Sequence, residues 1–592
     1  MVPPGSSAVA EPGAHKPVPE EDLKRLNLID PPVLFLMAIL AAVPAQSQSQ
    51  PDSASKLMET VDVRVINVDV VVTDRKGNAI QGLKRDDFQI FENGVPKKVS
   101  NFYEVRGNRT FDAESEPAPA EVATATAAPV PLKADDIPEH MRRRIIFFVD
   151  NLSLAPFNRN RVFKEMKEFA AKVMRPGDEA MIATFNRSMK VRVPFTRDAK
   201  QIQQAFDGIA GESAMGASNK SELTQTEDRI RDAQSYDDAV ATARSYSQSV
   251  EHDLRQSASA LNGLMSTLAG VEGKKVLVLT SEGFQISPGK ELFYFIDDIA
   301  REKKWNNAGS SIVESMSFDS TPLIQSIAKT ANANNITMYT IHAGGLGAAM
   351  SGSAENAKAV SFSVSQAGLS NSTDSLQLMA QMTGGLSAVS TNNFAAVFKN
   401  ITRDLDSYYS LGYRAGTERV DRQRNLDVRL VRPNRNYIIR SRQTFVEKST
   451  YAEMSDRIIA NLLYKTKAND MKILMKTNQP VAMDDGNFRV PVEVQIPMES
   501  LTILPQGEIF AGGFDLYVAV ANKDGDMSDV TQKQQQIHIP PADMQKTKGK
   551  YYAYTMDLVM ERGVNRISVG VVDQISNTTG FAREQVIAQD LR

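Results

Sequence analysis

The sequence predicts a multidomain α/β protein, in which a doubly wound, mostly parallel sheet is flanked by small β-sandwich-like domains on its N-terminal and C-terminal sides. Three observations predict this class. The length of 592 residues predicts about three or four domains of roughly 100–200 residues each. Short apolar strands alternate with helix-period segments between residues 141 and 447. Both flanks instead show the two-residue period of half-buried strands.

Composition narrows the class of partner. Hydrophobic residues make up 42% of the chain and charged residues 23%, as in an ordinary soluble globular protein. The net charge of -3 argues against nucleic-acid binding, because neutralising phosphates needs a basic surplus. The absence of cysteine excludes disulfides, thiolate zinc sites and anchoring through a lipidated cysteine. No histidine lies within a helical turn of another, so we expect no histidine-based metal site.

An apolar run at Val33–Val43 follows two basic residues and precedes the small-residue sequence Val43-Pro44-Ala45. The run is shorter than the ~20 residues that span a bilayer, so we expect no stable membrane span. The arrangement is typical of an export signal. We therefore assign residues 1–45 to a signal-peptide region and expect a periplasmic or extracellular location. A buried core helix is the alternative interpretation.

Composition and turn residues also divide the N-terminal and C-terminal parts of the chain into segments. Residues 46–57 are polar, and we expect them to be disordered. Alternating β-branched residues and Gly/Asn turns predict a small β domain over residues 58–108. An Ala- and Pro-rich linker follows over residues 109–140. Residues 448–592 are expected to form a helix, over 451–465, and a C-terminal β-sandwich domain.

The middle of the chain, residues 141–447, carries the α/β domain. A continuous apolar run at 145–149 ends in Asp150 and predicts a strand buried on both faces. Helix-period segments end at turn signals such as Pro176-Gly177. In chain order, the predicted elements are strand 145–149, helix 162–173, strands 180–185 and 190–193, helices 199–209 and 257–268, strand 275–279, helix 323–332, strand 336–341, and helices 374–382 and 394–405.

Two insertions and a last set of strands complete this domain. The polar, helix-compatible segment 212–250 and the Gly/Ser/Ala-rich loop 343–373 are expected to interrupt the α/β core as functional or disordered insertions. Strands at 408–413, 426–431 and 437–440 are expected to extend its sheet.

The strand ending in Asp150, the helix after it and a later apolar strand ending in Thr280-Ser-Glu-Gly283 together resemble the von Willebrand factor A fold, which is Rossmann-like. The segments Asp87–Gly94, Leu376–Gly385 and Tyr408–Tyr413 are similar to those of bacterial VWFA-related domain proteins of the acidobacterial type. This resemblance covers residues 58–445. It implies a divalent metal site built from an Asp-x-Ser-x-Ser loop, a threonine from a second loop and a Thr-Asp-Gly-type third loop.

The metal-site motif of that family is degenerate in this chain. Leu152 and Leu154 occupy the two serine positions of the first loop, and Ser281 or Glu282 stands where the family has aspartate. Because magnesium prefers octahedral oxygen ligands, the loss of two hydroxyls predicts a magnesium affinity no better than millimolar. A vestigial site, in which Asp150 caps the following turn, is the alternative interpretation. The remaining metal-site candidates are Asp150, Ser153, Ser213 and Glu282.

The sequence contains no recognisable catalytic set, so we expect a protein that binds and does not catalyse. Open α/β sheets bind ligands at the carboxyl ends of their strands, and we expect protein or peptide partners there. No cofactor is expected apart from this weakly bound magnesium. Two alternatives stay open. One is a periplasmic hydrolase, in which Asp150, Glu282 and His342 would converge in one pocket. The other is a structural component of the cell envelope.

The mature protein is expected to begin near Gln46, because the apolar run has the length of a signal segment and precedes a small-residue cleavage sequence. N-terminal sequencing of protein purified from its native host measures this start directly. Recovery of residues 1–30 on the mature protein would contradict the prediction.

Overall fold

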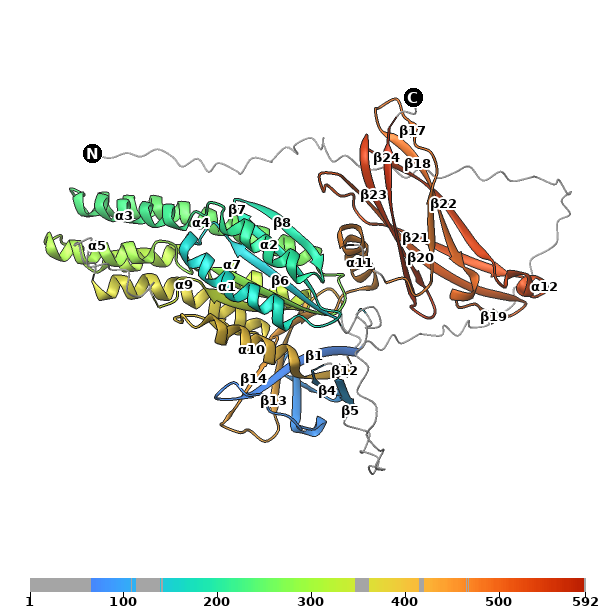
Figure 1. Cartoon of the computed structure of the whole chain (residues 1–592), viewed down its shortest axis with the longest axis horizontal. Coiled ribbons are helices and arrows are strands. Elements are labelled where there is room, and N and C mark those ends of the chain that lie inside the picture. Colours follow the sequence, from blue (N-terminus) through green and yellow to red (C-terminus); the bar gives the residue numbers. More distant parts are fainter. Residues whose placement is uncertain are drawn as a thin grey trace, which may run out of the picture.

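The chain folds into three units: a small β unit, an α/β unit and a C-terminal two-sheet unit (Figure 1). It is a mixed α/β protein with several sheets, as the sequence predicts. The predicted signal region 1–45 and the polar segment 46–57 lie outside the described residues. In the described part of the chain, no helix is both long enough and apolar enough to cross a membrane. The computed structural model describes residues 65–107, 109–112, 139, 142–346, 361–414, 420–464, 466 and 468–589.

The α/β unit is built on a six-stranded sheet with the order β11-β10-β9-β6-β7-β8. Neighbouring strands are parallel, except that β7 and β8 pair antiparallel. The sheet is therefore mixed, with one antiparallel strand at its edge. Its strands are β6 (Arg143–Asp150), β7 (Glu179–Asn186), β8 (Ser188–Thr196), β9 (Lys274–Ser281), β10 (Ile336–His342) and β11 (Ser387–Ala388).

Helices cover both faces of this sheet, which explains the continuous apolar run in β6. Successive side chains of a strand point to opposite faces. Ile145 and Phe147 accordingly lie in one hydrophobic core, and Ile146 and Phe148 in another. The first core is completed by α1 (Pro156–Val173), α2 (Ala199–Ala210) and α10 (Phe394–Asp406), and the second by α4 (Tyr236–Thr267), α7 (Thr321–Ala333) and α9 (Phe362–Thr383).

The segment predicted as a polar insertion, 212–250, is mostly helical. It supplies α3 (Gly216–Asp232) and the first half of α4. Helices α5 (Lys290–Glu302) and α6 (Ser310–Glu314), which the sequence analysis did not predict, lie nearby. Residues of α3, α4 and α5 share a separate hydrophobic core. These helices extend beyond the end of the sheet in Figure 1.

The predicted loop 343–373 is wrong in its last part. Helix α9 begins at Phe362, with the Ser361 hydroxyl accepting a hydrogen bond from the Val364 amide, and so it starts well before the predicted residue 374. Residues 347–360 lie outside the described part of the chain. Ser and Gly weaken the helix signal of this segment, and packing against α5 and α7 offsets their poor helix propensity.

The small β unit combines two segments that are far apart in the sequence. Strand β1 lies between β12 and β14, and β4 pairs with the other side of β12. In a second sheet, β13 pairs with β2. The strands are β1 (Val65–Asp74), β2 (Phe88–Glu92), β3 (Val95–Lys97), β4 (Val99–Arg106), β5 (Arg109–Asp112), β12 (Ser407–Arg414), β13 (Gln423–Leu430), β14 (Tyr437–Ser441) and β15 (Thr444–Val446).

This pairing corrects two predictions. The strands near residues 408–440 do not extend the central sheet, and segment 58–108 does not form its β unit alone. The predicted linker 109–140 also begins with a strand, because β5 pairs with β4. Alternation such as that of β13 shows which face of a strand is buried, but it does not identify the strand that lies beside it.

The C-terminal unit consists of helix α11 (Thr450–Tyr464) and two sheets. The inward faces of both sheets share one hydrophobic core, and α11 packs on the other side of β20 and β23. One sheet contains β16 (Leu474–Thr477), β17 (Val481–Ala482), β18 (Phe488–Pro497) and β22 (Tyr551–Met560). The other contains β19 (Leu504–Gln506), β20 (Ile509–Asn522), β21 (Thr531–Ile539), β23 (Gly563–Asp573) and β24 (Thr579–Ala588), with the short helix α12 (Pro541–Met544) after β21.

Cleavage of the chain between β5 and β6 is expected to leave its two fragments associated, because β1 and β4 flank β12 and β2 pairs with β13. The change is a site for a specific protease, inserted after Ala125. Size-exclusion chromatography of the cleaved protein should show both fragments in one peak, which separates only in denaturant. Separation in native buffer would contradict the observed pairing.

Candidate functional site

The candidate site lies at the carboxyl edge of the central sheet, where β6, β9 and β10 end side by side. In the parallel register, Val149 is opposite Thr280, and His342 is opposite Ser281. The residues that follow these three strands therefore lie side by side along one edge of the sheet. This edge is where open α/β sheets bind ligands.

Asp150 is the centre of the site. Its side chain is buried, and its Oδ2 accepts hydrogen bonds from Ser153 Oγ at 2.7 Å and Ser281 Oγ at 2.8 Å. The two serine hydroxyls are also 2.8 Å apart. The Glu282 amide donates to Ser153 Oγ at 3.0 Å. The loops after β6 and β9 are thus joined through one carboxylate oxygen.

Burial and hydrogen bonding act in opposite directions on this carboxyl group. Burial raises the pKa of Asp150, whereas the hydrogen bonds from Ser153 and Ser281 act to lower it. The second oxygen, Oδ1, is buried and has no hydrogen-bond partner in the described part of the chain. Oδ2 of Asp150 is therefore fixed by two hydrogen bonds, whereas Oδ1 accepts none from the described residues.

Glu282 has a structural task at this edge. Its Oε1 accepts hydrogen bonds from the Ala155 amide at 2.7 Å and from Asn158 Nδ2 at 3.1 Å. Ala155 is the N-cap residue of α1 and has no side-chain acceptor of its own. A carboxylate here satisfies a free helix amide and lies at the positive end of the helix dipole. Glu282 therefore caps α1 from a distant loop.

His342 lies next to this cluster but is not joined to it by a side-chain pair. It is buried, and its Nδ1 has no hydrogen-bond partner within the described ranges. Burial lowers the pKa of His342, and the nearby Glu282 opposes this shift. No hydrogen bond among the described residues joins His342 to the carboxylate of Asp150 or Glu282. The three groups of the hydrolase alternative are therefore neighbours, but they are not linked as an acid–base set.

Ser213 lies apart from the other metal-site candidates. It lines a neighbouring polar cavity of about 260 Å³ together with Asn151, Thr184 and Glu212. Its loop docks on the first loop, because the Gly216 amide donates to the Leu154 carbonyl at 3.0 Å. A Cβ at Gly216 would lie 2.4 Å from the Ser153 carbonyl oxygen, so this contact requires glycine.

The side chains of Leu152 and Leu154 pack in the two hydrophobic cores on either face of the sheet. Leu152 packs in the core that contains α4, and Leu154 in the core that contains α1. The positions that carry hydroxyls in the resembled family are thus packing positions in this chain. The described residues contain no group of three or more His, Asp or Glu placed to hold a metal. Asp150, Ser153 and Ser281 offer one carboxylate and two hydroxyls, which is fewer than the six oxygen ligands of magnesium.

Two residues of this edge lie outside the predicted set of metal-site candidates, although Ser281 was one of the two residues considered for the third-loop position. Ser281, and not Glu282, is the third-loop residue that contacts Asp150. Arg159 is fully buried and donates to Asn151 Oδ1 at 3.1 Å and to the carbonyls of Ala210 at 3.0 Å and Glu212 at 2.9 Å. Arg159 lies on the same helix face as the apolar residues Val162 and Phe163, and this spacing was the feature of the sequence that could have indicated its burial. Arg159 holds the first loop against the loop that follows α2.

Comparisons with known proteins add little to this geometry. No protein-family model and no curated protein sequence matches the chain. An aerotolerance-related membrane protein from Bacteroides fragilis matches at 9% identity over 45% of this chain and 98% of that one, with a TM-score of 0.23. The conserved hypothetical protein BatB from Bacteroides thetaiotaomicron matches at 10% identity over 45% and 97%, with a TM-score of 0.20.

A third solved structure, proximal thread matrix protein 1 from the mussel byssus with a zinc-occupied MIDAS motif, matches at 11% identity. The match covers 47% of this chain and 49% of that one, with a TM-score of 0.20. TM-scores this low support no conclusion about the fold or function of this chain.

Replacing Glu282 by alanine is expected to destabilise the protein by removing the acceptor that caps α1. Loss of an N-cap acceptor typically lowers the free energy of unfolding by about 1 kcal/mol, and we expect a loss of that size. Urea unfolding of Glu282→Ala and wild type measures it. The matched control is Glu168→Ala on α1, which removes only an exposed pair with Lys172 and should change stability far less. Equal effects of the two substitutions would contradict the capping role.

Proposed function

We propose that this chain is a non-catalytic, exported binding protein, and that its von Willebrand factor A-like α/β unit binds a protein or peptide partner at the carboxyl edge of the central sheet. The fold proposal rests on β6 ending in Asp150 and on the contact of Asp150 with the loop after β9. The exported, periplasmic or extracellular location follows from the expected signal region 1–45. The acidic net charge favours a partner other than nucleic acid.

The observation that carries the proposal is the exposure of Phe157 at this edge. The Phe157 side chain is 78% exposed in the first turn of α1, next to Asn158, which binds Glu282. A large apolar side chain left in water gains free energy when a partner covers it, and aromatic residues often dominate the energy of protein interfaces. Leu346, half-exposed after β10, adds apolar surface, and Arg161 joins α1 to the same loop through the Ala343 carbonyl at 2.8 Å.

The hydrogen bonding of the polar cluster favours binding over catalysis. A general base or nucleophile needs a free atom directed at the substrate and a partner that activates it. Asp150 Oδ2 is already occupied by two serine hydroxyls, and Glu282 caps α1. The free Oδ1 of Asp150 is buried, and no hydrogen bond within the described residues links it to His342 as an activating partner. These contacts support a rigid scaffold for the surrounding loops more than the hydrolase alternative. The structural-envelope alternative differs from our proposal in requiring no specific partner at Phe157.

Metal has no necessary role in this proposal. We infer that magnesium binds no more tightly than millimolar, because only one carboxylate and two hydroxyls converge and Leu152 and Leu154 fill the remaining loop positions. Partner binding is therefore expected to be the same with magnesium as with a chelator.

The proposal is tested by placing a photo-crosslinking amino acid at Phe157 in the native host. The matched control is the same amino acid at Tyr551, an exposed aromatic of β22 in the C-terminal unit. Illumination should yield one defined crosslinked species from position 157 that position 551 does not give. Gel shift and mass spectrometry identify the product, with and without EDTA.

Two results would count against the proposal. If both positions gave the same products, or none, the carboxyl edge would not be a specific binding surface. Loss of the Phe157 product in EDTA would show that a metal takes part, contrary to the inferred weakness of the site. The proposal is supported if the crosslink persists in EDTA, is lost when unlabelled wild-type protein is added in excess, and is retained when unlabelled Phe157→Ala is added instead.

A further inference from the structure

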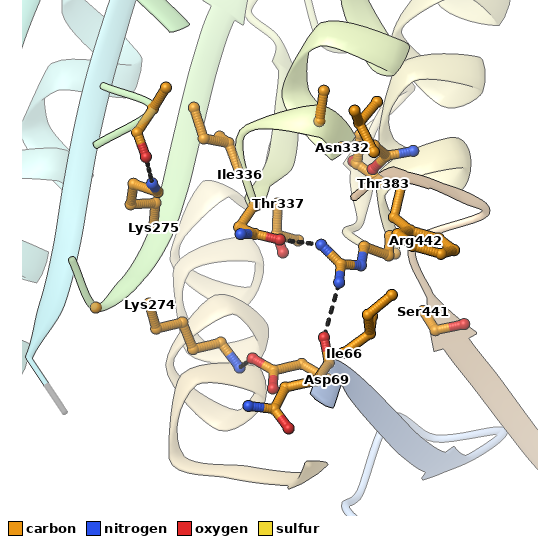
Figure 2. Close-up of a pocket in the computed structure, with 18 of the residues that line it drawn as sticks. Ile66, Asp69, Lys274, Lys275, Asn332, Ile336, Thr337, Thr383, Ser441 and Arg442 are labelled. Atoms are coloured by element: carbon orange, nitrogen blue, oxygen red, sulfur yellow. Dashed lines mark hydrogen bonds and ion pairs between the residues drawn. The ribbon is translucent and has the colours of Figure 1, made fainter. Parts of the chain in front are cut away.

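A cavity of about 760 Å³ lies at the opposite edge of the central sheet, near the amino ends of β9 and β10. It is bounded by β1 of the small β unit, by the segment around β14 and β15, and by α11. Figure 2 shows Asp69, Lys274, Thr337 and Arg442 around this space. The cavity is separate from the carboxyl edge, because the amino and carboxyl ends of parallel strands lie at opposite edges of a sheet.

Most charged groups on the cavity wall are already paired. Lys274 Nζ lies 3.2 Å from Asp69 Oδ2 and 3.1 Å from the centre of the Tyr408 ring. Across the cavity, Lys448 pairs with Asp456. The remaining wall pairs are Arg457 with Glu272, Arg440 with Asp404, and Glu447 with Arg424. These pairs contribute no net charge to the wall.

Arg442 is the exception. Its guanidinium donates to the Asn67 carbonyl at 2.7 Å and to Asn335 Oδ1, and both acceptors are neutral. Its Nε is buried and has no partner, and no ion pair of Arg442 occurs within the described ranges. Burial lowers the pKa of Arg442. The charge of Asp69, which pairs with Lys274, opposes this shift, so a bound anion would give Arg442 a direct counter-charge that it does not share.

Two further groups define the polarity of the cavity. Lys275 Nζ donates to three carbonyls at the end of α4, those of Leu268, Ala269 and Val271 at 2.9–3.0 Å, and has no carboxylate partner. Asn332 is 1% exposed, and its Oδ1 has no hydrogen-bond partner. Burial lowers the pKa of Lys275 to about 7, so the guanidinium of Arg442 is the clearer cation of the two. The wall therefore combines a guanidinium that has only neutral direct partners with a buried acceptor that needs a donor.

We propose that this cavity binds a small organic oxyanion, a carboxylate or a phosphate, whose charge pairs with Arg442 and whose neighbouring hydroxyl or amine donates to Asn332 Oδ1. Guanidinium groups bind both anions through directional hydrogen bonds. The site is independent of the proposed partner surface, because it lies at the other edge of the sheet. Its ligand would touch Arg442, between β14 and β15 of the small β unit, and Asn332 in α7 of the α/β unit.

Isothermal titration calorimetry of the full chain tests this, with inorganic phosphate, succinate and malate as probes at constant ionic strength. We expect saturable binding of at least one probe, weakened at least tenfold in Arg442→Gln. The matched control is Arg429→Gln, an exposed arginine of β13 paired with Asp427, which should bind as wild type does. Malate has a hydroxyl that succinate lacks, so it should bind several-fold more tightly if Asn332 accepts that hydroxyl.

The proposal would be overturned if no probe bound saturably, or if Arg442→Gln bound as wild type does. Equal affinities for malate and succinate would overturn the role of Asn332. If Arg442→Gln failed to fold, Thr337→Glu replaces it, since Thr337 is only half-buried on the cavity wall and a carboxylate there would repel the anion. Unchanged binding in Thr337→Glu would contradict the site.

Discussion

Strand β6 is the constraint on which both edges of the α/β unit depend. It is buried along its whole length and pairs in parallel on both sides, with β7 and with β9. At its carboxyl end, Asp150 joins the loops after β6 and β9 through two serine hydroxyls. At its amino end, Arg143 binds Asp178 at 2.8 Å and Asp406 at 2.8 Å, directly before β12 of the small β unit. One strand therefore organises the proposed binding edge and also anchors the neighbouring unit.

Buried charge is handled differently at different places in this molecule. In the small β unit, Arg424 lies between Glu92 and Glu447, and all three are buried. Each charge of this network has an opposite charge beside it, and removing one partner from a buried pair typically costs about 3–5 kcal/mol. Arg442, by contrast, has only neutral acceptors. The contrast between Arg424 and Arg442 is the physical basis for expecting a ligand at one of them and not at the other.

Much of the α/β unit could be predicted from local patterns, because a helix or strand that is buried on one or both faces has apolar residues at a characteristic spacing. The run 145–149 and the helix periods after it correspond to β6 and the helices on its two faces. Segment 212–250 was expected only as a polar, helix-compatible insertion, whereas α3 and α4 bury their sparse apolar residues against α5. A helix that buries only a narrow stripe of apolar residues gives a weak signal in a segment whose composition is mostly polar.

The sequence by itself determined which residues alternate, which runs are buried, and that Asp150 ends a central strand. Only the tertiary structure decided that β12 joins β1 and β4, because a half-buried strand fits any edge with a matching face. It also decided that Ser281 contacts Asp150 while Glu282 turns to cap α1, although the two residues are adjacent in the chain. Neighbouring side chains on a loop point in different directions, and the elements packed around that loop determine which of them meets the carboxylate.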